Sequence, residues 1–109
     1  MPKFLWRVSY TTQGAQGLQK EGGSARRAAV QKLVELAGGK LEAFYFALGE
    51  SDVYAIADLP DATTAAAISV TVNGAGASHL RTVQLLTPEE VDKAVKKAVD
   101  YRPPGSGAR

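Results

Sequence analysis

Alternation of apolar and polar side chains marks the first predicted strand. Residues 3–10 read KFLWRVSY, which places Phe4, Trp6 and Val8 on one face and Arg7 on the other. A period of two with aromatic and branched residues is typical of a strand that buries one face. The chain therefore opens with a strand whose aromatic face points toward a core.

The next segment changes to a helical period. Apolar residues recur three and four positions apart within 24–37, which predicts an amphipathic helix with Ser24 as N-cap and Gly38 just past its end. Residues 11–23 lie before it and contain four glycines. Because glycine weakens a helix, this stretch predicts a loop with one helical turn.

The remaining patterns predict two further strands in a hairpin, a helix, a strand and a last helix. Pro60 ends the hairpin, and Asp61 can cap a helix of small residues. Thr87 followed by Pro88 and by Glu90 is a helix start of the capping-box type. The predicted ranges are a hairpin of strands 41–48 and 53–59, a helix over 61–73, a strand over 80–86, and a helix from 87 carrying Val91, Ala94, Val95 and Ala98.

This order, βαββαβ plus a terminal helix, predicts an α+β protein with a ferredoxin-like sandwich. Right-handed crossovers place both helices on one face of a four-stranded antiparallel sheet. The other face is then bare and apolar, and large exposed apolar patches are rare on monomers. We therefore expect a homodimer or higher oligomer of the dimeric α+β barrel kind. The bare face is expected to carry Leu5, Phe44, Phe46, Ile56, Val83 and Leu85.

Composition and charge narrow the function classes. The 109 residues carry a net charge of +2 and no cysteine, which excludes disulfides and thiolate chemistry. Residues 1–92 hold 8 Lys and Arg against 10 Asp and Glu, and residues 93–109 hold 5 against 1. The basic excess thus lies at the end of the chain and not on the body, so no nucleic-acid partner is expected. No apolar run approaches a membrane span, and a cytoplasmic protein is the default.

Five polar residues gather on the predicted bare face. They contribute two cations, a phenol, a carboxylate and the single imidazole of the chain, a set that suits a small anionic ligand. The alternative is structural: an arginine pairs with the carboxylate across the sheet, and the histidine begins a solvated strand. Metal ligation is not expected, because one His without a near partner does not make a site. The residues are Arg7, Tyr54, Asp58, His79 and Arg81.

A second candidate for anion binding is the glycine-rich entry to the helix that follows residue 23. Ser24, Arg26 and Arg27 lie in its first turn, where free N–H groups and partial positive charge favour an anion. The spacing matches neither phosphate-loop pattern, and ordinary capping accounts for Ser24. We retain both interpretations, with capping preferred.

The tetrapeptide GESD at residues 49–52 joins the two strands of the hairpin. Gly49 supplies a position for positive φ, and Asp52 can bond the local backbone, so turn chemistry accounts for the segment. Glu50 and Asp52 as paired carboxylates are the alternative, although they offer too few oxygens for Ca²⁺. No metal and no cofactor are expected here.

Residues 2 to about 104 resemble the GYD domain family, a group of small bacterial ferredoxin-like proteins related to dimeric α+β barrels. The resemblance rests on KFLWRVSYTTQGAQGL, GGSARRAAVQKL, GGKLEAFYFALGESDVYAIADLPD and LLTPEEVD. In the turn that names the family, Gly49 and Asp52 match and Ser51 replaces tyrosine. The resemblance implies a domain over 1–100, and the run of Pro103, Pro104 and Gly105 predicts an extended or flexible tail over 101–109.

The resemblance implies little about activity, because no biochemical function is generally attributed to the family. The predicted function is therefore a homo-oligomeric domain that binds a small anionic molecule on the face of its sheet. A cofactor-free oxygenase or isomerase inside a dimeric barrel is the alternative, and it rests on analogy of fold alone.

Overall fold

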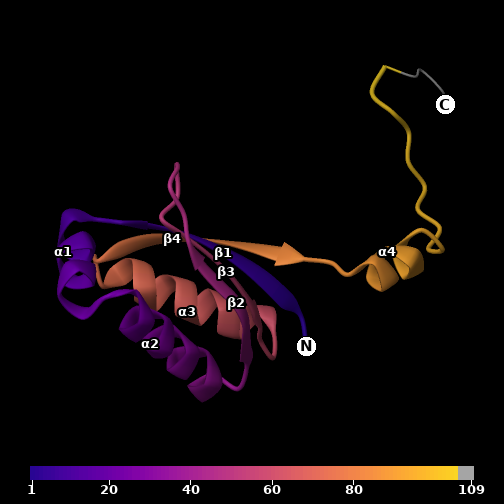
Figure 1. Ribbon diagram of the computed structural model, residues 1–109. Helices are drawn as coiled ribbons and strands as arrows, with labels where there is room; N and C mark the ends of the chain where they lie inside the picture. The colour runs from indigo at the N-terminus through magenta and orange to yellow at the C-terminus, as the bar shows by residue number, and fades with distance from the viewer. Residues whose placement is uncertain (106–109) are drawn as a thin grey trace.

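A four-stranded antiparallel sheet forms the centre of the molecule (Figure 1). The computed structural model describes residues 1–105. The sheet has the order β2-β3-β1-β4, so the two hairpin strands lie at one side and the first strand is central. The elements are β1 (Lys3–Tyr10), α1 (Thr12–Glu21), α2 (Gly23–Leu36), β2 (Lys40–Phe46), β3 (Val53–Asp58), α3 (Ala62–Gly74), β4 (Ser78–Leu85) and α4 (Pro88–Ala94).

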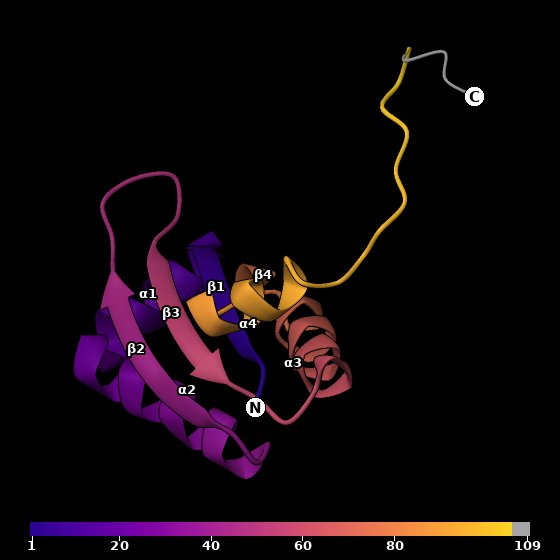
Figure 2. The ribbon, with the colours of Figure 1, turned by 90° about the vertical axis from the view of Figure 1, so that its right-hand side faces the viewer.

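The helices divide the sheet into a covered face and an open face. α1, α2 and α3 all lie on one side of the strands, below them in Figure 1. The other side carries no helix in the described part of the chain, and only the loop of residues 47–52 rises above it (Figures 1 and 2). This is the predicted α+β architecture, consistent with a ferredoxin-like fold.

The covered face holds the core. Alternate residues of β1 and β3 point toward the helices, so Phe4, Trp6 and Ala55 are nearly fully buried. Val34 of α2 and Leu59 after β3 are completely buried and close the layer between helices and sheet. Burying a side chain of this size contributes about 1.5–3 kcal/mol, which makes this layer the main source of stability.

Two aromatic residues lie on the opposite face from the one predicted. The β2–β3 register pairs Phe44 with Ala55 and Tyr45 with Tyr54, so Phe44 belongs to the covered face and is buried there. Phe46 has the same parity as Phe44 and is 43% exposed. The prediction was wrong because both faces of β2 are apolar, and pattern alone cannot orient such a strand.

Most of residues 11–23, where a loop was predicted, forms the helix α1 over Thr12–Glu21. Thr11 caps α1 by accepting a hydrogen bond from the Gly14 N–H at 3.2 Å. Gly14 is needed for close approach, because a Cβ there would lie 1.9 Å from the carbonyl oxygen of Ala77. Gly22, at φ +83°, ends α1 and turns the chain into α2. Tertiary contact and chain reversal thus account for these glycines, which do not break the helix.

The caps of the other helices follow the sequence more closely. Asp61 accepts the Thr64 N–H at 2.8 Å at the start of α3, and Thr87 and Glu90 form the predicted capping box of α4. Gly38 lies just past the end of α2 with φ +87°, as predicted. Ser24 is not the N-cap of α2, because the helix begins at Gly23, the residue before Ser24, and Gly22 holds the cap position.

The end of the chain projects from the body as an arm. We call residues 86–101 the C-terminal arm; it contains α4, which packs against no other element of the described chain (Figures 1 and 2). The radius of gyration is 17.8 Å, compared with about 13 Å for a compact domain of this length. α4 ends at Ala94, so the observed helix is shorter than the predicted one, which included Ala98. Of the predicted tail, residues 106–109 lie outside the described residues.

Candidate functional site

The strand register places two arginines opposite each other on the open face. Arg7 of β1 pairs with Arg81 of β4 on one side and with Tyr54 of β3 on the other. Ser9, two residues further along β1, pairs with His79. Because alternate residues of a strand share a face, these side chains stand together on the surface that no helix covers.

Four of these residues and two from the loop line a cleft of about 250 Å³. The sequence-predicted residues Arg7, His79 and Arg81 meet there. Tyr54 stands beside Arg7 in the register but does not line the cleft, and Asp58 is not part of it. The full lining is Arg7, Ser9, Glu50, Ser51, His79 and Arg81.

The charge in this cleft is not balanced by ion pairs. Among residues 1–105, neither Arg7 nor Arg81 has a carboxylate oxygen within 4 Å. Glu50 is the one acidic residue of the lining. Its backbone carbonyl oxygen accepts a hydrogen bond from the Ser9 hydroxyl at 3.3 Å. Two like charges directly opposite on neighbouring strands destabilise a sheet unless something compensates them.

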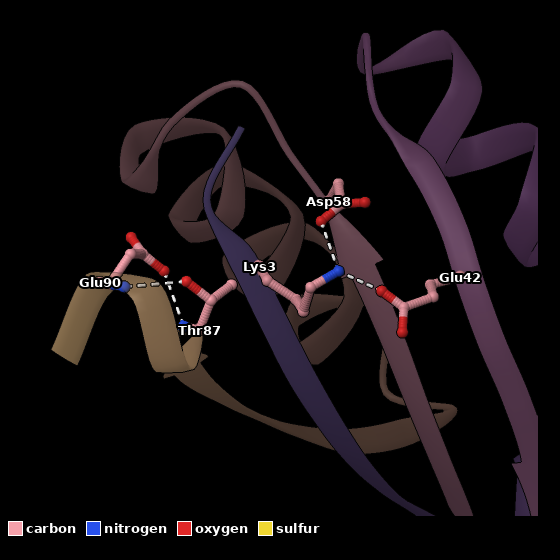
Figure 3. A network of polar contacts seen from close by, with 5 residues as sticks. All are labelled: Lys3, Glu42, Asp58, Thr87 and Glu90. Atoms are coloured by element: carbon pink, nitrogen blue, oxygen red, sulfur yellow. Dashed lines mark hydrogen bonds and ion pairs between the residues drawn. The ribbon is translucent and has the colours of Figure 1, made fainter. Parts of the chain in front are cut away.

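Asp58 lies at the other end of the open face and has a different partner. Lys3 donates from Nζ to Asp58 Oδ1 at 2.9 Å and also pairs with Glu42 (Figure 3). The hydrogen bond to Glu42, followed by the one to Asp58, raises the pKa of Lys3 above its usual value. The structural alternative in which an arginine of the open face pairs with Asp58 is therefore wrong, because a lysine occupies that carboxylate.

The family turn is held by contacts to β1 in addition to its own backbone hydrogen bond, in which the Ala47 N–H donates to the Asp52 carbonyl at 2.8 Å. Asp52 accepts the Tyr10 N–H at 2.8 Å through Oδ2, and its own N–H donates to the Val8 carbonyl at 2.7 Å. Ser51 is buried and lines the cleft. Gly49 does not have positive φ, so the reason predicted for it is wrong. The loop thus brings its residues to the cleft because Asp52 ties it to the neighbouring strand.

The second candidate set is divided between two surfaces. Ser24 and Arg27 lie in a shallow groove with the aromatic residues of β2. Arg26 instead turns toward the helix–sheet layer, with Nε 3.1 Å from Glu21 Oε2. That contact is an ion pair by distance but lacks hydrogen-bond geometry. The three side chains therefore do not converge on one anion.

Three lining residues of the cleft were not predicted to lie beside the two arginines. Ser9 could have been found, because alternation along β1 places it on the same face as Arg7. Glu50 and Ser51 carried no such signal, since their position depends on how the loop folds back over the open face. Alternation predicts the face of residues within a strand, but it cannot place the residues of a loop.

Two kinds of site are not found in the described residues. Residues 1–105 hold no group of three or more His, Asp or Glu side chains placed to bind a metal ion. Over the same range, every helix is too short or too polar to cross a bilayer.

Comparison with known families gives one match. The model of the GYD domain matches residues 4–95 of the chain, and the chain belongs to this family. Searches among curated proteins and among solved structures find no match. The match covers helices α1 to α4, the loop that contributes to the cleft, and all four strands except Lys3 at the start of β1.

Proposed function

We propose that this GYD domain protein binds a small anion in the cleft of its open face. The observation that carries the proposal is the register pair of Arg7 and Arg81, two cations opposite each other with no acidic partner among residues 1–105. A carboxylate or phosphate between them would accept charge-assisted hydrogen bonds from both guanidinium groups. The attraction of each guanidinium group to the anion would then offset the repulsion between Arg7 and Arg81.

The other lining residues support a ligand of limited size. The cleft volume of about 250 Å³ suits a small organic acid or phosphate ester and not a polymer. The Ser9 hydroxyl and the imidazole of His79 add further hydrogen-bonding groups beside the cations. Glu50 at the rim disfavours a highly charged polyanion, so a small acid with no more than three acidic groups is expected.

Citrate is a suitable first probe, with binding followed by calorimetry. The unmodified protein is expected to give a saturable isotherm, and Arg7→Gln or Arg81→Gln should each weaken binding about tenfold or more, because a hydrogen bond to a charged group is lost. Arg102→Gln is the matched control, since it makes the same charge change on the exposed tail. Equal citrate affinity in Arg81→Gln and Arg102→Gln would contradict the proposal.

We also propose that the open face is where two copies of the chain meet. Leu5 lies opposite both Ile56 and Val83 in the register, which makes a continuous apolar patch across three strands. Such a patch on a bare sheet is stabilised when a second copy covers it. The C-terminal arm adds the exposed residues Val91, within α4, and Val95, the residue at its C-cap, which lie four positions apart.

Sedimentation tests the self-association directly. The unmodified chain is expected to sediment as a dimer or larger species at micromolar concentration, and Leu5→Glu should shift it toward the monomer because a charge in the interface lacks a partner. Leu36→Glu is the control, because Leu36 is 79% exposed on α2, away from the open face. A monomeric unmodified chain would exclude this part of the proposal.

A second candidate function is a cofactor-free enzyme of the oxygenase or isomerase class. The observation that favours it is the single imidazole, His79, in the same cleft as two arginines. A base beside fixed cations is the arrangement that proton abstraction next to a carbonyl requires. Deuterium exchange into pyruvate, followed by proton NMR, tests this reaction class; loss of the exchange in His79→Ala would support it, and no exchange above the buffer rate would exclude it for this probe.

A further inference from the structure

The C-terminal arm carries apolar side chains that its own chain does not cover. Val91 is 45% exposed, Val95 is 76% exposed and Val99 is 82% exposed. α4 belongs to the matched family domain, yet it packs against no other element of the described chain (Figure 1). A short helix is marginal in water by itself, because packing of an apolar face supplies most helical stability. The arm is therefore a segment that needs a partner surface.

One side of α4 combines valines with a carboxylate. Successive residues of a helix are turned by about 100° around its axis, so Asp92 lies beside Val91 and the C-cap residue Val95. Glu89 lies on the other side of the helix, and Glu90 is engaged in the capping box (Figure 3). Asp92 is exposed, and it forms no ion pair among residues 1–105. α4 thus presents an apolar stripe with one carboxylate at its edge.

The open face presents the complementary pattern. In the strand register Leu5 pairs with Val83, and two residues along the same strands Arg7 pairs with Arg81. Two residues of a strand span about 7 Å, and a helix with its side chains is about 10–12 Å wide. One helix can therefore cover both pairs. An apolar pair beside two cations that lack an acidic partner among residues 1–105 matches an apolar stripe beside a carboxylate.

The connection between β4 and α4 directs the arm away from its own sheet. Leu86 and Thr87 form this connection without a turn or bend, and Thr87 is extended, with φ −74° and ψ 159°. α4 therefore lies beyond the end of its own sheet and not over it (Figure 1). To reach the arginines of the same chain, the backbone would have to reverse at these two residues. The open face of a second copy requires no such reversal.

We propose that the C-terminal arm of each copy lies across the open face of a second copy, with the Asp92 carboxylate between Arg7 and Arg81 of that copy. The two carboxylate oxygens accept hydrogen bonds from the two guanidinium groups, and the valines of the arm cover the apolar pair. Exchange of an identical segment is a low-cost route to a symmetric dimer, in which the same contact forms twice. The exchange rests on the self-association proposed above and identifies the segment through which the copies meet.

The docked carboxylate occupies the place of the proposed anionic ligand. The arm and a small anion therefore compete for the same two guanidinium groups, and each weakens the binding of the other by the same factor. Citrate should accordingly raise the dissociation constant of the dimer, and saturation with citrate without any such rise would contradict the exchange. In the dissociated chain the arginines only repel each other, so the loss of Arg81 lowers the affinity between copies and not the stability of a single chain.

Sedimentation of two charge-matched variants tests which side of α4 is docked. Asp92→Asn and Glu89→Gln each remove one negative charge, from opposite sides of a helix that packs against no element of its own chain. Asp92→Asn should raise the dissociation constant of the dimer about tenfold or more, the effect of losing a hydrogen bond to a charged group. Glu89→Gln should change it by less than about twofold. In an Arg81→Gln background, Asp92→Asn should have a smaller effect, because its partner is already absent.

A spin label on the arm shows which copy the arm reaches. The chain contains no cysteine, so Ala98→Cys creates a single labelling site on the arm. When spin-labelled chains are mixed with isotope-labelled chains, the spin label should broaden the amide signals of Leu5 and Val83 in the isotope-labelled copy. Leu36→Cys is the control, because Leu36 is 79% exposed on α2 and a label there should leave these signals sharp.

The outcomes separate the exchange from the self-association on which it rests. A dimer with broadened signals in the isotope-labelled copy supports the exchange. A dimer without this broadening, or with broadening only when both labels are on one chain, overturns the exchange and leaves the self-association standing. Equal effects of Asp92→Asn and Glu89→Gln overturn the exchange as well, and a monomeric unmodified chain overturns both. Sedimentation and broadening are measured without citrate, so they decide the exchange whether or not the anion site binds its ligand.

Discussion

The two faces of the sheet use the same four strands for opposite purposes. On the covered face, Phe4, Trp6 and Ala55 are buried among helices, and no charged side chain of the strands points inward. On the open face, Leu5 and Ile56 stand beside paired and unpaired charges and remain partly exposed. The covered face determines stability, and the open face carries the unbalanced charge on which the proposed anion binding depends. The comparison shows that a residue's face, set by register, decides its role more than its chemical type.

Adjacent aromatic residues of β2 give the largest expected contrast between the faces. Phe44→Ala should lower the free energy of unfolding by about 3–5 kcal/mol because it empties a core position. Tyr45→Ala, one residue along on the open face and 72% exposed, should change it by less than about 0.5 kcal/mol in the dissociated chain. Denaturant unfolding at low protein concentration measures both. Equal losses would mean that the register of β2 is shifted by one residue.

The loop that reaches over the open face depends on a contact to the central strand. Asp52→Ala leaves the N–H of Tyr10 without its acceptor and should lower the free energy of unfolding by about 1–3 kcal/mol. It should also weaken citrate binding, since Ser51 and Glu50 lose their position in the cleft. Asp52→Asn keeps an acceptor oxygen and is the control. An unchanged citrate affinity in Asp52→Ala would show that the loop does not shape the cleft.

Removing one cation from the open face should have a smaller effect and the opposite sign. Arg81→Gln relieves the repulsion with Arg7 and should raise the free energy of unfolding by roughly a few tenths of a kcal/mol at low salt. The gain should fade at high salt, where exposed charges are screened. Thermal unfolding without added anions checks this. A loss of stability would mean that Arg81 makes favourable contacts within the chain.

The smallest expected effect is a pH dependence of the stability that the N-cap of α3 contributes. The Thr64 N–H and hydroxyl bond the carboxylate of Asp61 and lower its pKa below 3.8. A lowered native pKa stabilises the fold above the unfolded pKa, and this contribution is lost as the pH falls through the native value. Asp61→Asn keeps a capping oxygen that does not titrate. The difference in Tm between the two proteins should be constant above pH 5 and change only below about pH 4.

Most of the fold could be predicted because its signals are local. The period of two in β1, the capping box at Thr87 and the chain reversal at Gly38 each depend on a few neighbouring residues. The helix α1 could not be predicted, because glycine weakens a helix and only the tertiary structure shows that Gly14 is required where the carbonyl of Ala77 lies against it. A glycine is required at position 14 because of a contact with a residue 63 positions away in the sequence (77 − 14).

The candidate site shows the same division. Alternation brought Arg7, His79 and Arg81 to one surface, where the cleft is found. Alternation also grouped Asp58 with these residues, because it predicts the face of a side chain but not its position along the strand. Asp58 lies on the predicted face but at the far end from the cleft. Lys3 lies opposite Asp58 and binds it, which leaves the two arginines without that partner.

The sequence by itself determined the order of the elements, the covered face of β1 and the membership in the GYD domain family, because these depend on short-range periodicity and on residue identity. The tertiary structure alone decided which carboxylate meets which cation, that Asp52 holds its loop to β1, and that α2 and α3 lie over opposite sides of the sheet. These features arise from register and packing between distant segments. No local pattern of residues encodes such distances.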